Sequence, residues 1–402
     1  MHFETKRLRV LHVITHLAVG GAAETVIASC RMSHPEIESA ICCGQTPAGE
    51  DSWDDLTDFA GIQVSRLPSL RRSVHPWVDA LAYKTLTEKL RREKWDVVHT
   101  HGSKAGILGR MAASAAGVPA IVHTVHGWGH HERQSPQARW MFVSAERRAA
   151  RITDRMIVVA DANREKGLRD QIGVREQYVT VLPGIDIARF RDVVVDRGAL
   201  RREFGIPEDA QVIGTISRLA TQKAPEDFVR VASEVCKRFP KAHFVFIGDG
   251  PLRKLYLDDI KNAGLEDRMH LLGYRDDVPR LLRLFDVFLL TSLWEGLPRV
   301  FSQAMCASLP IVATNVDGAP EAIEDNVTGY LVEPKDVARL ADRVIHLLEN
   351  PKVRMEMGQK GLEAVDPKFS EREMVQRTED VYWSCQHKKT SSVTRAYHLQ
   401  KG

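Results

Sequence analysis

The sequence alternates between short apolar runs and segments with helical periodicity along most of its length. Residues 8–15, LRVLHVIT, form a β-branched apolar run, which is followed by a glycine turn and a helical segment. This order of strand, turn and helix recurs up to residue 190 and restarts at residue 211. Strands that alternate with helices form parallel sheets covered by helices. The sequence therefore predicts an α/β fold with two doubly wound domains, in which ligands bind at the carboxyl ends of the strands.

A charged segment with weak periodicity, residues 191–209, separates the two series. The length of 402 residues suits two domains of ordinary size. We expect an N-terminal domain over 1–190 and a C-terminal domain over 191–368. Residues 369–390 are predicted to form a terminal helix. Residues 391–402 are predicted to be a disordered tail because they are polar and lie at a chain end.

The net charge limits the possible binding partners, and the cysteine pattern indicates the cellular compartment of the protein. The formal net charge of +3 is mildly basic, which suits an anionic substrate or membrane surface, and nucleic acid is not expected as a partner. The six cysteines include no C-x-x-C pair, which favours reduced, packed thiols in a cytoplasmic protein. The N-terminal segment has no long apolar stretch, so neither a signal peptide nor a transmembrane helix is expected.

Two cations follow the first strand of the second series. Arg218 and Lys223 lie in SRLATQK, at the end of a strand predicted over 211–217. Arginine offers a planar fork of donors and lysine a point charge, so the pair suits a diphosphate. A solvated basic loop is the alternative interpretation of these residues.

Two glycine turns precede predicted helices. In FIGDGPL, Gly248 and Gly250 stand before Pro251, a residue suited to the first turn of a helix. In VGGAAE, Gly20 and Gly21 allow close approach of the backbone ahead of another helix. The N–H groups of such turns bind anions. Neither turn is a G-x-G-x-x-G motif or a P-loop, so a dinucleotide site is not predicted.

A single acidic residue stands at the end of an apolar strand in TSLWEGLPRVFSQAM. Glu295 follows a strand predicted over 285–292, and a helix is expected to begin near Pro298. The unpaired N–H groups from Leu297 onward suit phosphate, and a carboxylate accepts hydrogen bonds from sugar hydroxyls. Gln303 lies about one turn into the helix. The pattern favours a nucleotide sugar, and a charge that only stabilises the helix N-terminus is the alternative.

Histidines are dense in the first series: His99, His101, His123, His126, His130 and His131. Zinc is one interpretation of this density, but no matching set of aspartate, glutamate or cysteine ligands stands out, so we predict no metal site. His126 precedes a glycine, where the backbone can bend toward a ligand. We therefore predict that His126 forms a hydrogen bond in a polar pocket.

Taken in order along the chain, these motifs resemble the retaining glycosyltransferases of family 4, which have the GT-B fold. The matching segments are GGAAE, HTHGSKAGILGR, HTVHGWG, LPGID, SRLATQK, IGDGPL, LGYRDDV, EGLPRVFSQAM and GAPEAI. The resemblance covers most of the chain. It implies two Rossmann-like domains that face each other across a cleft. The C-terminal domain would hold a nucleotide sugar, the N-terminal domain would present the acceptor, and the last helix would cross back onto the first domain.

The resemblance also implies roles for individual residues. Arg218 and Lys223 match the pair that holds the donor diphosphate, and Glu295 matches a glutamate near the transferred sugar. Gln303 stands where a second glutamate usually accepts hydrogen bonds from the ribose, and an amide oxygen can still accept them. His126 matches a histidine near the donor sugar. The other donor-binding positions that follow from the motifs are Gly20, Gly21, Gly250, Arg275, Leu297 and Pro298.

The implied activity is the transfer of a sugar without a metal ion. No cofactor is expected, because the nucleotide sugar is a substrate. We expect the nucleotide to be UDP. Arg218, Lys223 and the helix dipole would stabilise the leaving diphosphate, and no protein nucleophile is assigned. The acceptor would be a glycan or a lipid-linked glycan in surface polysaccharide synthesis, reached at the inner face of a membrane. A nucleotide-sugar 2-epimerase on the same fold and a catalytically silent carbohydrate-binding relative are the alternatives.

Overall fold

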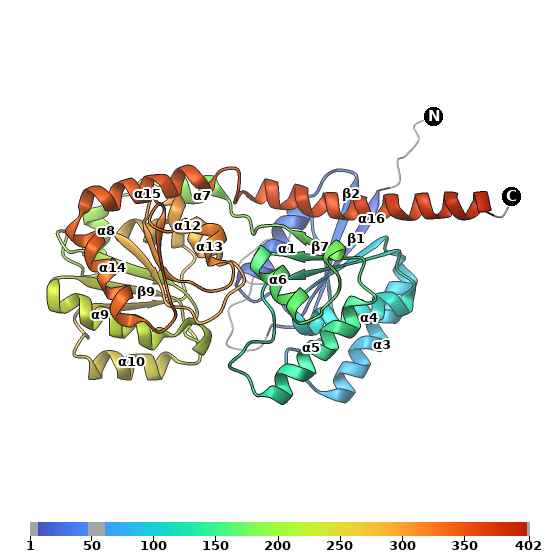
Figure 1. The fold of residues 1–402 in the computed structure, drawn as a ribbon, viewed down its shortest axis with the longest axis horizontal. Coiled ribbons are helices and arrows are strands. Elements are labelled where there is room, and N and C mark those ends of the chain that lie inside the picture. The colour runs from blue at the N-terminus through green and yellow to red at the C-terminus, as the bar shows by residue number, and fades with distance from the viewer. Residues whose placement is uncertain (1–6, 47–60, 400–402) are drawn as a thin grey trace. The chain divides into compact units, whose positions relative to one another are not determined.

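The structure, a computed structural model, describes residues 7–46 and 61–399. The chain divides into two compact units (Figure 1). Met1–Gly184 and Glu371–Gly402 form the first unit, and Ile185–Ser370 forms the second. Each contains one parallel sheet covered by helices, which confirms the predicted α/β class with two doubly wound domains.

The first unit contains a seven-stranded sheet in the order β3-β2-β1-β4-β5-β6-β7. Ile14 at the end of β1 pairs with His101 at the end of β4, which in turn pairs with Thr124 of β5. These three strands therefore end at one edge of the sheet. The strands are β1 (Leu8–Ile14), β2 (Ile37–Cys43), β3 (Gln63–Arg66), β4 (Val97–His101), β5 (Ala120–Val125), β6 (Arg155–Val158) and β7 (Tyr178–Thr180).

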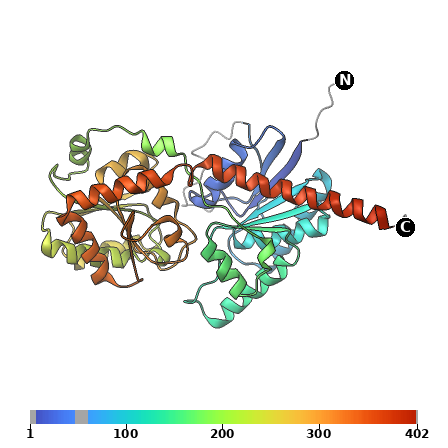
Figure 2. The ribbon, with the colours of Figure 1, turned by 45° about the horizontal axis from the view of Figure 1, so that its top comes forward.

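Helices cover both faces of the first sheet. Apolar residues of α3 and α4 pack on one face, and α1 and the last helix, α16, pack on the other. Figure 2 shows α16 lying across the strands of this unit. The helices are α1 (Gly21–Arg31), α3 (Pro76–Glu93), α4 (Ser103–Ala116), α5 (Pro136–Ala150), α6 (Asp161–Arg169), the 3-10 turn η1 (Arg175–Gln177) and α16 (Glu371–Leu399).

The terminal helix is longer than the sequence predicts. Its apolar residues, among them Val375 and Tyr382, belong to the core of the first sheet. Helix α16 includes residues 391–399 of the tail, and the disorder expected there stays a prediction. Residues 371–399 contain neither proline nor glycine, so no residue type that commonly ends a helix interrupts them. Residues 400–402 lie outside the described residues.

The second unit contains a six-stranded sheet in the order β10-β9-β8-β11-β12-β13. Helices α9, α10 and α14 contribute to a large apolar core on the sheet. The strands are β8 (Val212–Ile216), β9 (His243–Ile247), β10 (Met269–Gly273), β11 (Val287–Leu290), β12 (Ile311–Thr314) and β13 (Gly329–Val332). The helices and 3-10 turns are α7 (Ile187–Arg191), α8 (Arg197–Glu203), η2 (Thr221–Lys223), α9 (Pro225–Arg238), α10 (Arg253–Asn262), α11 (Val278–Leu281), η3 (Leu282–Leu284), α12 (Arg299–Cys306), α13 (Ala319–Ala322), α14 (Val337–Glu349) and α15 (Pro351–Val365).

The first unit ends at Gly184, six residues before the boundary expected at residue 190. The Ile185 amide donates to the carbonyl of Phe369 at 2.8 Å. The Arg283 guanidinium donates to the carbonyl of Phe190 at 2.7 Å. Residues 185–191 therefore bond to the second unit, although their sequence continues the last strand-and-turn motif of the first series.

Both sheets contain a point where the strand order reverses. The reversal lies between β1 and β4 in the first unit and between β8 and β11 in the second. The loops that leave neighbouring strands at such a point diverge and open a crevice, where ligands of open parallel sheets bind. The cations predicted after β8 and the carboxylate predicted after β11 flank this point in the second sheet.

Candidate active site

The structure brings Lys223 and Glu295 together as an ion pair, although 72 residues separate them. Lys223 ends η2, in the loop after β8, and Glu295 lies in the loop after β11. Their side chains are only 18% and 7% exposed. An ammonium group has three N–H donors, so Lys223 can bond to Glu295 and still donate to an anionic ligand.

Neighbouring side chains hold the Glu295 carboxylate in place. The Ser292 hydroxyl donates to Oε1 at 2.6 Å, and the Gln222 amide donates to Oε2 at 3.3 Å. The backbone N–H of Glu295 donates to Asp317 Oδ2 at 2.7 Å. Sequence reasoning missed Ser292, Gln222 and Asp317 as supports, although Gln222 stands next to Lys223 and Asp317 immediately precedes the GAPEAI segment.

Backbone contacts join the two loops of the site. The Leu293 amide donates to the carbonyl of Gln222 at 2.7 Å, and the Thr291 hydroxyl donates to the carbonyl of Lys223 at 2.9 Å. Ala224 adopts a left-handed conformation, with φ of 44°, immediately before α9 begins at Pro225. The loop that positions Lys223 is therefore fixed by hydrogen bonds on both sides.

The glycine turn after β9 lies directly behind the Arg218 loop. The Leu219 amide donates to the carbonyl of Asp249 at 3.0 Å, and the Leu252 amide donates to the carbonyl of Leu219 at 3.0 Å. Helix α10 begins only at Arg253, so the expectation that Pro251 occupies the first helical turn is wrong. The residues from Gly250 to Leu252 instead form a turn closed by these bonds.

We expect Gly250→Ala to weaken donor binding about tenfold. A Cβ atom at this position would lie 2.5 Å from the carbonyl oxygen of Leu219, so the backbone beside Arg218 must shift. Overpacking of this kind costs about 1–3 kcal/mol. Titration calorimetry with nucleotide measures the effect. Gly198→Ala is the control, because its Cβ would meet side-chain atoms alone, the flexible end of Glu208 at 2.8 Å and Asp196 Oδ1 at 3.4 Å. Unchanged affinity in Gly250→Ala would contradict the supporting role of the turn.

Helix α12 begins immediately after the Glu295 loop. Its N-cap residue is Pro298, whose side chain offers no acceptor to the first turn. The first N–H groups of a helix have no partner within the helix and carry its positive dipole end. Leu297 and Pro298 are buried, and Gln303 is half-buried in the second turn. This agrees with the position predicted for Gln303, and its contact with ribose stays a prediction.

Arg275 is held by a neighbour in the same loop. Its guanidinium donates to both carboxylate oxygens of Asp277, each at 2.8 Å. This hydrogen bonding raises the pKa of Arg275 and lowers that of Asp277. A guanidinium bonded twice to the same carboxylate restrains the loop after β10. The donor-binding role assigned to Arg275 stays a prediction.

The glycines and the histidine predicted in the first unit lie at one edge of its sheet. Gly20 is the N-cap of α1 with φ of 155°, and a Cβ at this position would meet no atom within 4 Å. Gly21 is the first residue of the helix. His126 follows β5 directly, and its Nε2 lies 3.1 Å from Nδ1 of His101. The two glycines follow β1, on one side of the reversal between β1 and β4, and His126 follows β5, one strand beyond β4.

Three buried histidines of the first sheet have nitrogens within 4.8 Å of one another: His12, His99 and His101. A divalent ion would need a lone pair from each of these rings. The two nitrogens of His99 already lie 2.6 Å from the Tyr382 hydroxyl and 2.7 Å from the Thr124 hydroxyl. None of the three ligands carries negative charge. The cluster therefore fits a hydrogen-bonded network better than a metal site.

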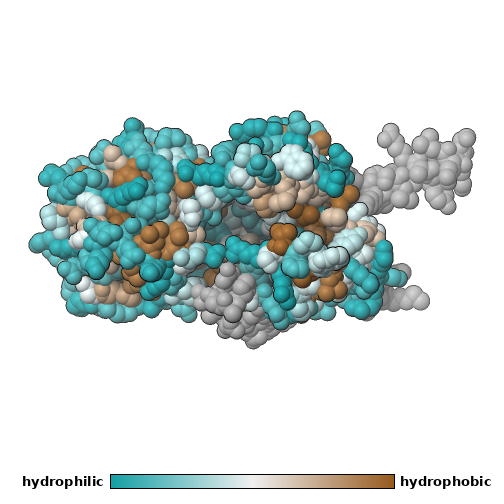
Figure 3. All heavy atoms as spheres, turned by 90° about the horizontal axis from the view of Figure 1, so that it is seen from below, coloured by the Kyte–Doolittle hydropathy of each residue, from teal (hydrophilic) through white to brown (hydrophobic). Residues whose placement is uncertain are grey.

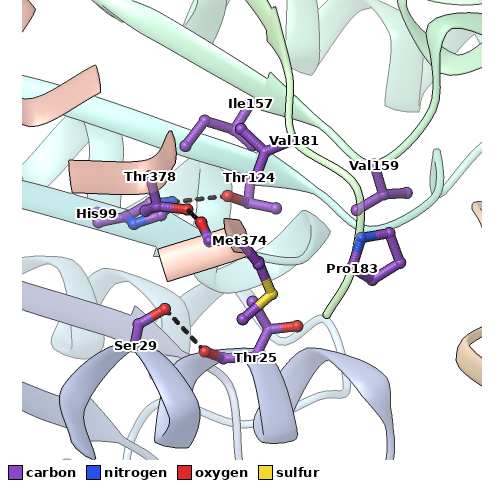
Figure 4. A pocket seen from close by; sticks show the side chains of 10 residues that line it. All are labelled: Thr25, Ser29, His99, Thr124, Ile157, Val159, Val181, Pro183, Met374 and Thr378. Atoms are coloured by element: carbon purple, nitrogen blue, oxygen red, sulfur yellow. Dashed lines mark hydrogen bonds between the residues drawn. The ribbon is translucent and has the colours of Figure 1, made fainter. Parts of the chain in front are cut away.

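A small cavity lies against His99, between α1, α16 and the sheet (Figure 4). Its volume of about 10 Å³ is enough for one water molecule and far too small for a sugar. The hydroxyls on its walls bond within the protein, for example that of Ser29 to the carbonyl of Thr25 at 2.8 Å.

Comparisons with known proteins agree with this geometry. The model described as glycosyl transferase 4-like domain matches residues 7–184, and that described as glycosyl transferases group 1 matches residues 196–364. An Escherichia coli UDP-Gal:alpha-D-GlcNAc-diphosphoundecaprenol alpha-1,3-galactosyltransferase is 31% identical over 306 residues, which are 73% of this chain and 78% of that protein. The chain belongs to the family 4-like glycosyltransferases of the GT-B fold.

One further relative and one solved structure are also similar to this chain. A GDP-mannose-dependent phosphatidylinositol monomannoside mannosyltransferase of Mycobacterium tuberculosis is 30% identical to this glycosyltransferase over 332 residues, which are 79% of this chain and 82% of that protein. The structure of Anabaena HepE in complex with UDP-glucose superposes with a TM-score of 0.80 at 20% identity, covering 94% of this chain and 100% of that one. At this identity the superposition shows a shared fold.

Two further expectations concern the state of the cysteines and the presence of a membrane-spanning helix. All six cysteines are free thiols, and all but Cys236 are buried. Across residues 7–46 and 61–399, every helix is too short or too polar to span a bilayer.

Proposed function

We propose that this glycosyltransferase moves a sugar from a UDP-linked donor to a lipid-linked glycan, with retention of anomeric configuration, in surface polysaccharide synthesis. The observation that carries the proposal is the Lys223–Glu295 pair, which joins the loop after β8, where Arg218 also lies, to the loop that leads into α12. UDP is supported as the carrier by the Escherichia coli relative, named for a UDP-Gal donor and a diphosphoundecaprenol-linked acceptor.

Each group has a role in this proposal. Arg218, Lys223 and the N–H groups that open α12 stabilise the negative charge that builds on the leaving diphosphate, so no metal ion is required. Glu295 accepts hydrogen bonds from the transferred sugar, and Gln303 accepts them from the ribose. His126 forms a hydrogen bond with the sugar from the first unit. The leaving phosphate takes the proton of the acceptor hydroxyl, so the protein supplies no nucleophile.

We expect UDP to stabilise the protein against heat. A ligand present at about 100 times its dissociation constant adds about 2.7 kcal/mol to the free energy of unfolding. A melting scan with and without UDP measures the effect. Gln303→Ala should shrink the shift if its amide contacts ribose, while Gln359→Ala, exposed on α15 and bonded to Glu363, should keep it. The absence of a shift at millimolar UDP in the wild type would count against the proposed donor.

A transfer assay separates this function from the alternatives. Turnover of UDP-sugar should require an acceptor and survive addition of a chelator. Sugar epimerisation without acceptor would favour the 2-epimerase. Binding without any turnover would favour the silent carbohydrate-binding protein.

A lipid-linked acceptor agrees with the surface of the first unit. Trp77 and Leu81 stand one turn apart near the start of α3 and are 82% and 56% exposed, and Trp140 on α5 is 72% exposed. Figure 3 shows exposed hydrophobic side chains on the side of this unit that α3 and α5 form. Arg71 and Arg72 precede α3 and are exposed. Aromatic residues beside cations favour an anionic membrane interface.

The basic segment KLRREK, residues 89–94 at the other end of α3, forms several of its bonds within the protein. Lys89 pairs with Glu93 at 2.7 Å, and the Arg91 guanidinium donates to the carbonyl of Ala115 at 2.9 Å. The apolar N-terminal end of the helix is therefore the better candidate for contact with lipid.

We expect Trp77→Ser to reduce binding to vesicles of anionic phospholipid about threefold to tenfold, because an aromatic side chain buried at the interface contributes on the order of 1 kcal/mol. Co-sedimentation with the vesicles measures binding. Val194→Ser in the second unit is the control, since Val194 is 96% exposed but lies in the other unit. Equal binding of the Trp77 variant and the wild type would contradict the membrane contact.

A further inference from the structure

Three histidines from neighbouring strands of the first sheet form a hydrogen-bonded chain. His12 lies on β1, His101 ends β4, and His126 follows β5. Nδ1 of His12 lies 3.1 Å from Nε2 of His101, and Nδ1 of His101 lies 3.1 Å from Nε2 of His126. The ring planes of the two pairs are inclined by only 20° and 27°, with centroids 5.3 Å and 5.4 Å apart, so the rings meet edge to edge as a hydrogen bond between ring nitrogens requires. The chain runs from the interior of the sheet to its carboxyl edge.

Burial keeps the inner two rings neutral. His12 is 0% exposed and His101 is 1% exposed. Desolvation lowers the pKa of His12 to about 4. Burial also lowers the pKa of His101 well below its ordinary value. Four neighbouring rings lower it further: His99, His12, His126 and His123. At neutral pH each inner ring therefore has one nitrogen that donates and one that accepts.

The connectivity of the chain couples the protons of all three rings. His101 uses both nitrogens, so it must donate in one hydrogen bond and accept in the other. Each bond joins Nδ1 of one ring to Nε2 of the next. If His101 carries its proton on Nδ1, then His12 and neutral His126 must carry theirs on Nδ1 as well. If the proton of His101 is on Nε2, all three protons are on Nε2.

We infer that His12 and His101 are positioning residues that fix the tautomer of His126 through this shared proton arrangement. The inference rests on the proposed function, in which His126 forms a hydrogen bond with the donor sugar. Among the described residues, no hydrogen-bond partner lies against the buried Nε2 of His12, so the chain ends inside the protein. Because the three protons shift together, the state of the two buried rings sets whether Nδ1 of His126 is a donor or an acceptor.

The arrangement of the neighbouring rings supports a chain rather than a metal site. Both nitrogens of His101 are used within the chain, and both nitrogens of His99 are used by Tyr382 and Thr124. A metal ion bound to His12, His99 and His101 would have to replace several of these hydrogen bonds.

Nitrogen NMR of the full chain tests the shared tautomer directly. The protein is labelled with ¹⁵N-histidine, and the imidazole signals of His126 are assigned by comparison with His126→Gln. The inference predicts one common protonated nitrogen in His12, His101 and His126. It also predicts that His101→Leu changes the balance between the two tautomers of His126. Different tautomers along the wild-type chain, an unchanged His126 in His101→Leu, or stoichiometric metal in the purified protein would overturn it.

Kinetics test whether the fixed tautomer matters for transfer. His12→Leu should lower kcat/KM for the UDP-sugar between about twofold and tenfold, the effect of one net hydrogen bond. Its affinity for UDP alone should not change, because UDP lacks the transferred sugar that His126 is proposed to contact. His12→Asn should recover most of the activity, since its amide reaches the position of the ring Nδ1. His123→Asn is the control, because His123 is buried on β5 and bonds to Thr100 outside the chain.

The outcomes distinguish the inference from the proposed function. Equal losses in His12→Leu, His12→Asn and His123→Asn, with equal losses of UDP affinity, would indicate a general packing effect and overturn the positioning role. A wild-type protein that turns over no UDP-sugar would overturn the proposed function. The NMR result would still decide whether the three rings share one tautomer.

Discussion

Lys223→Ala is expected to lower the rate of sugar transfer at saturating donor by about 10²–10³, the effect of removing one preorganised donor from a developing oxyanion. Lys223 is positioned by its ion pair with Glu295 and by backbone bonds to the loop after β11. Its charge acts on the leaving diphosphate, whose negative charge grows in the transition state, so the loss should appear in kcat.

The control for this experiment is Lys241→Ala, which removes an exposed lysine of the same unit before β9. Both variants should retain folded circular dichroism spectra, because Ser292 and Gln222 still bond to Glu295 in the absence of Lys223. A Lys223→Ala enzyme with kcat close to that of the wild type would show that the diphosphate is stabilised elsewhere.

Glu146→Ala is expected to lower the free energy of unfolding of the first unit by about 3–5 kcal/mol. Glu146 on α5 pairs with Arg110 on α4, with Oε2 and Nη2 2.6 Å apart. The arginine side chain is 0% exposed and the glutamate 6%. Removing the carboxylate leaves a buried guanidinium without its counter-charge. Thermal unfolding measures the effect, and a loss of about 3 kcal/mol corresponds to about 6–12 °C in a unit of this size.

Two variants make the Glu146 experiment specific. The double variant Arg110→Met/Glu146→Leu should recover most of the lost stability, because apolar residues of similar volume remove both buried charges together. Glu165→Ala breaks an exposed pair with Arg175 and should leave the melting temperature nearly unchanged. If Glu146→Ala has the same melting temperature as Glu165→Ala, the buried pair does not stabilise the unit as expected.

The sequence determined the two sheets and the edge at which the site lies. β-branched runs that alternate with helical segments can bury their apolar residues only in helix-covered parallel sheets. The carboxyl ends of parallel strands share one edge, so Arg218, Lys223 and Glu295 could be assigned to that edge from their positions after apolar runs. The glycines before α1 and the start of α12 near Pro298 followed from local backbone preferences in the same way.

The tertiary structure alone decided which distant residues meet. Lys223 reaches Glu295 because β8 lies beside β11, and His12 reaches His101 because β1 lies beside β4. The periodicity of a segment predicts that it is a strand. It does not predict which strand lies beside it, because the order of the strands depends on the packing of the whole sheet. The same reason explains why residues 185–191 bond to the second unit and why α16 covers the first sheet. An apolar stripe on a helix specifies that it must be buried, and only the assembled sheet supplies the surface that buries it.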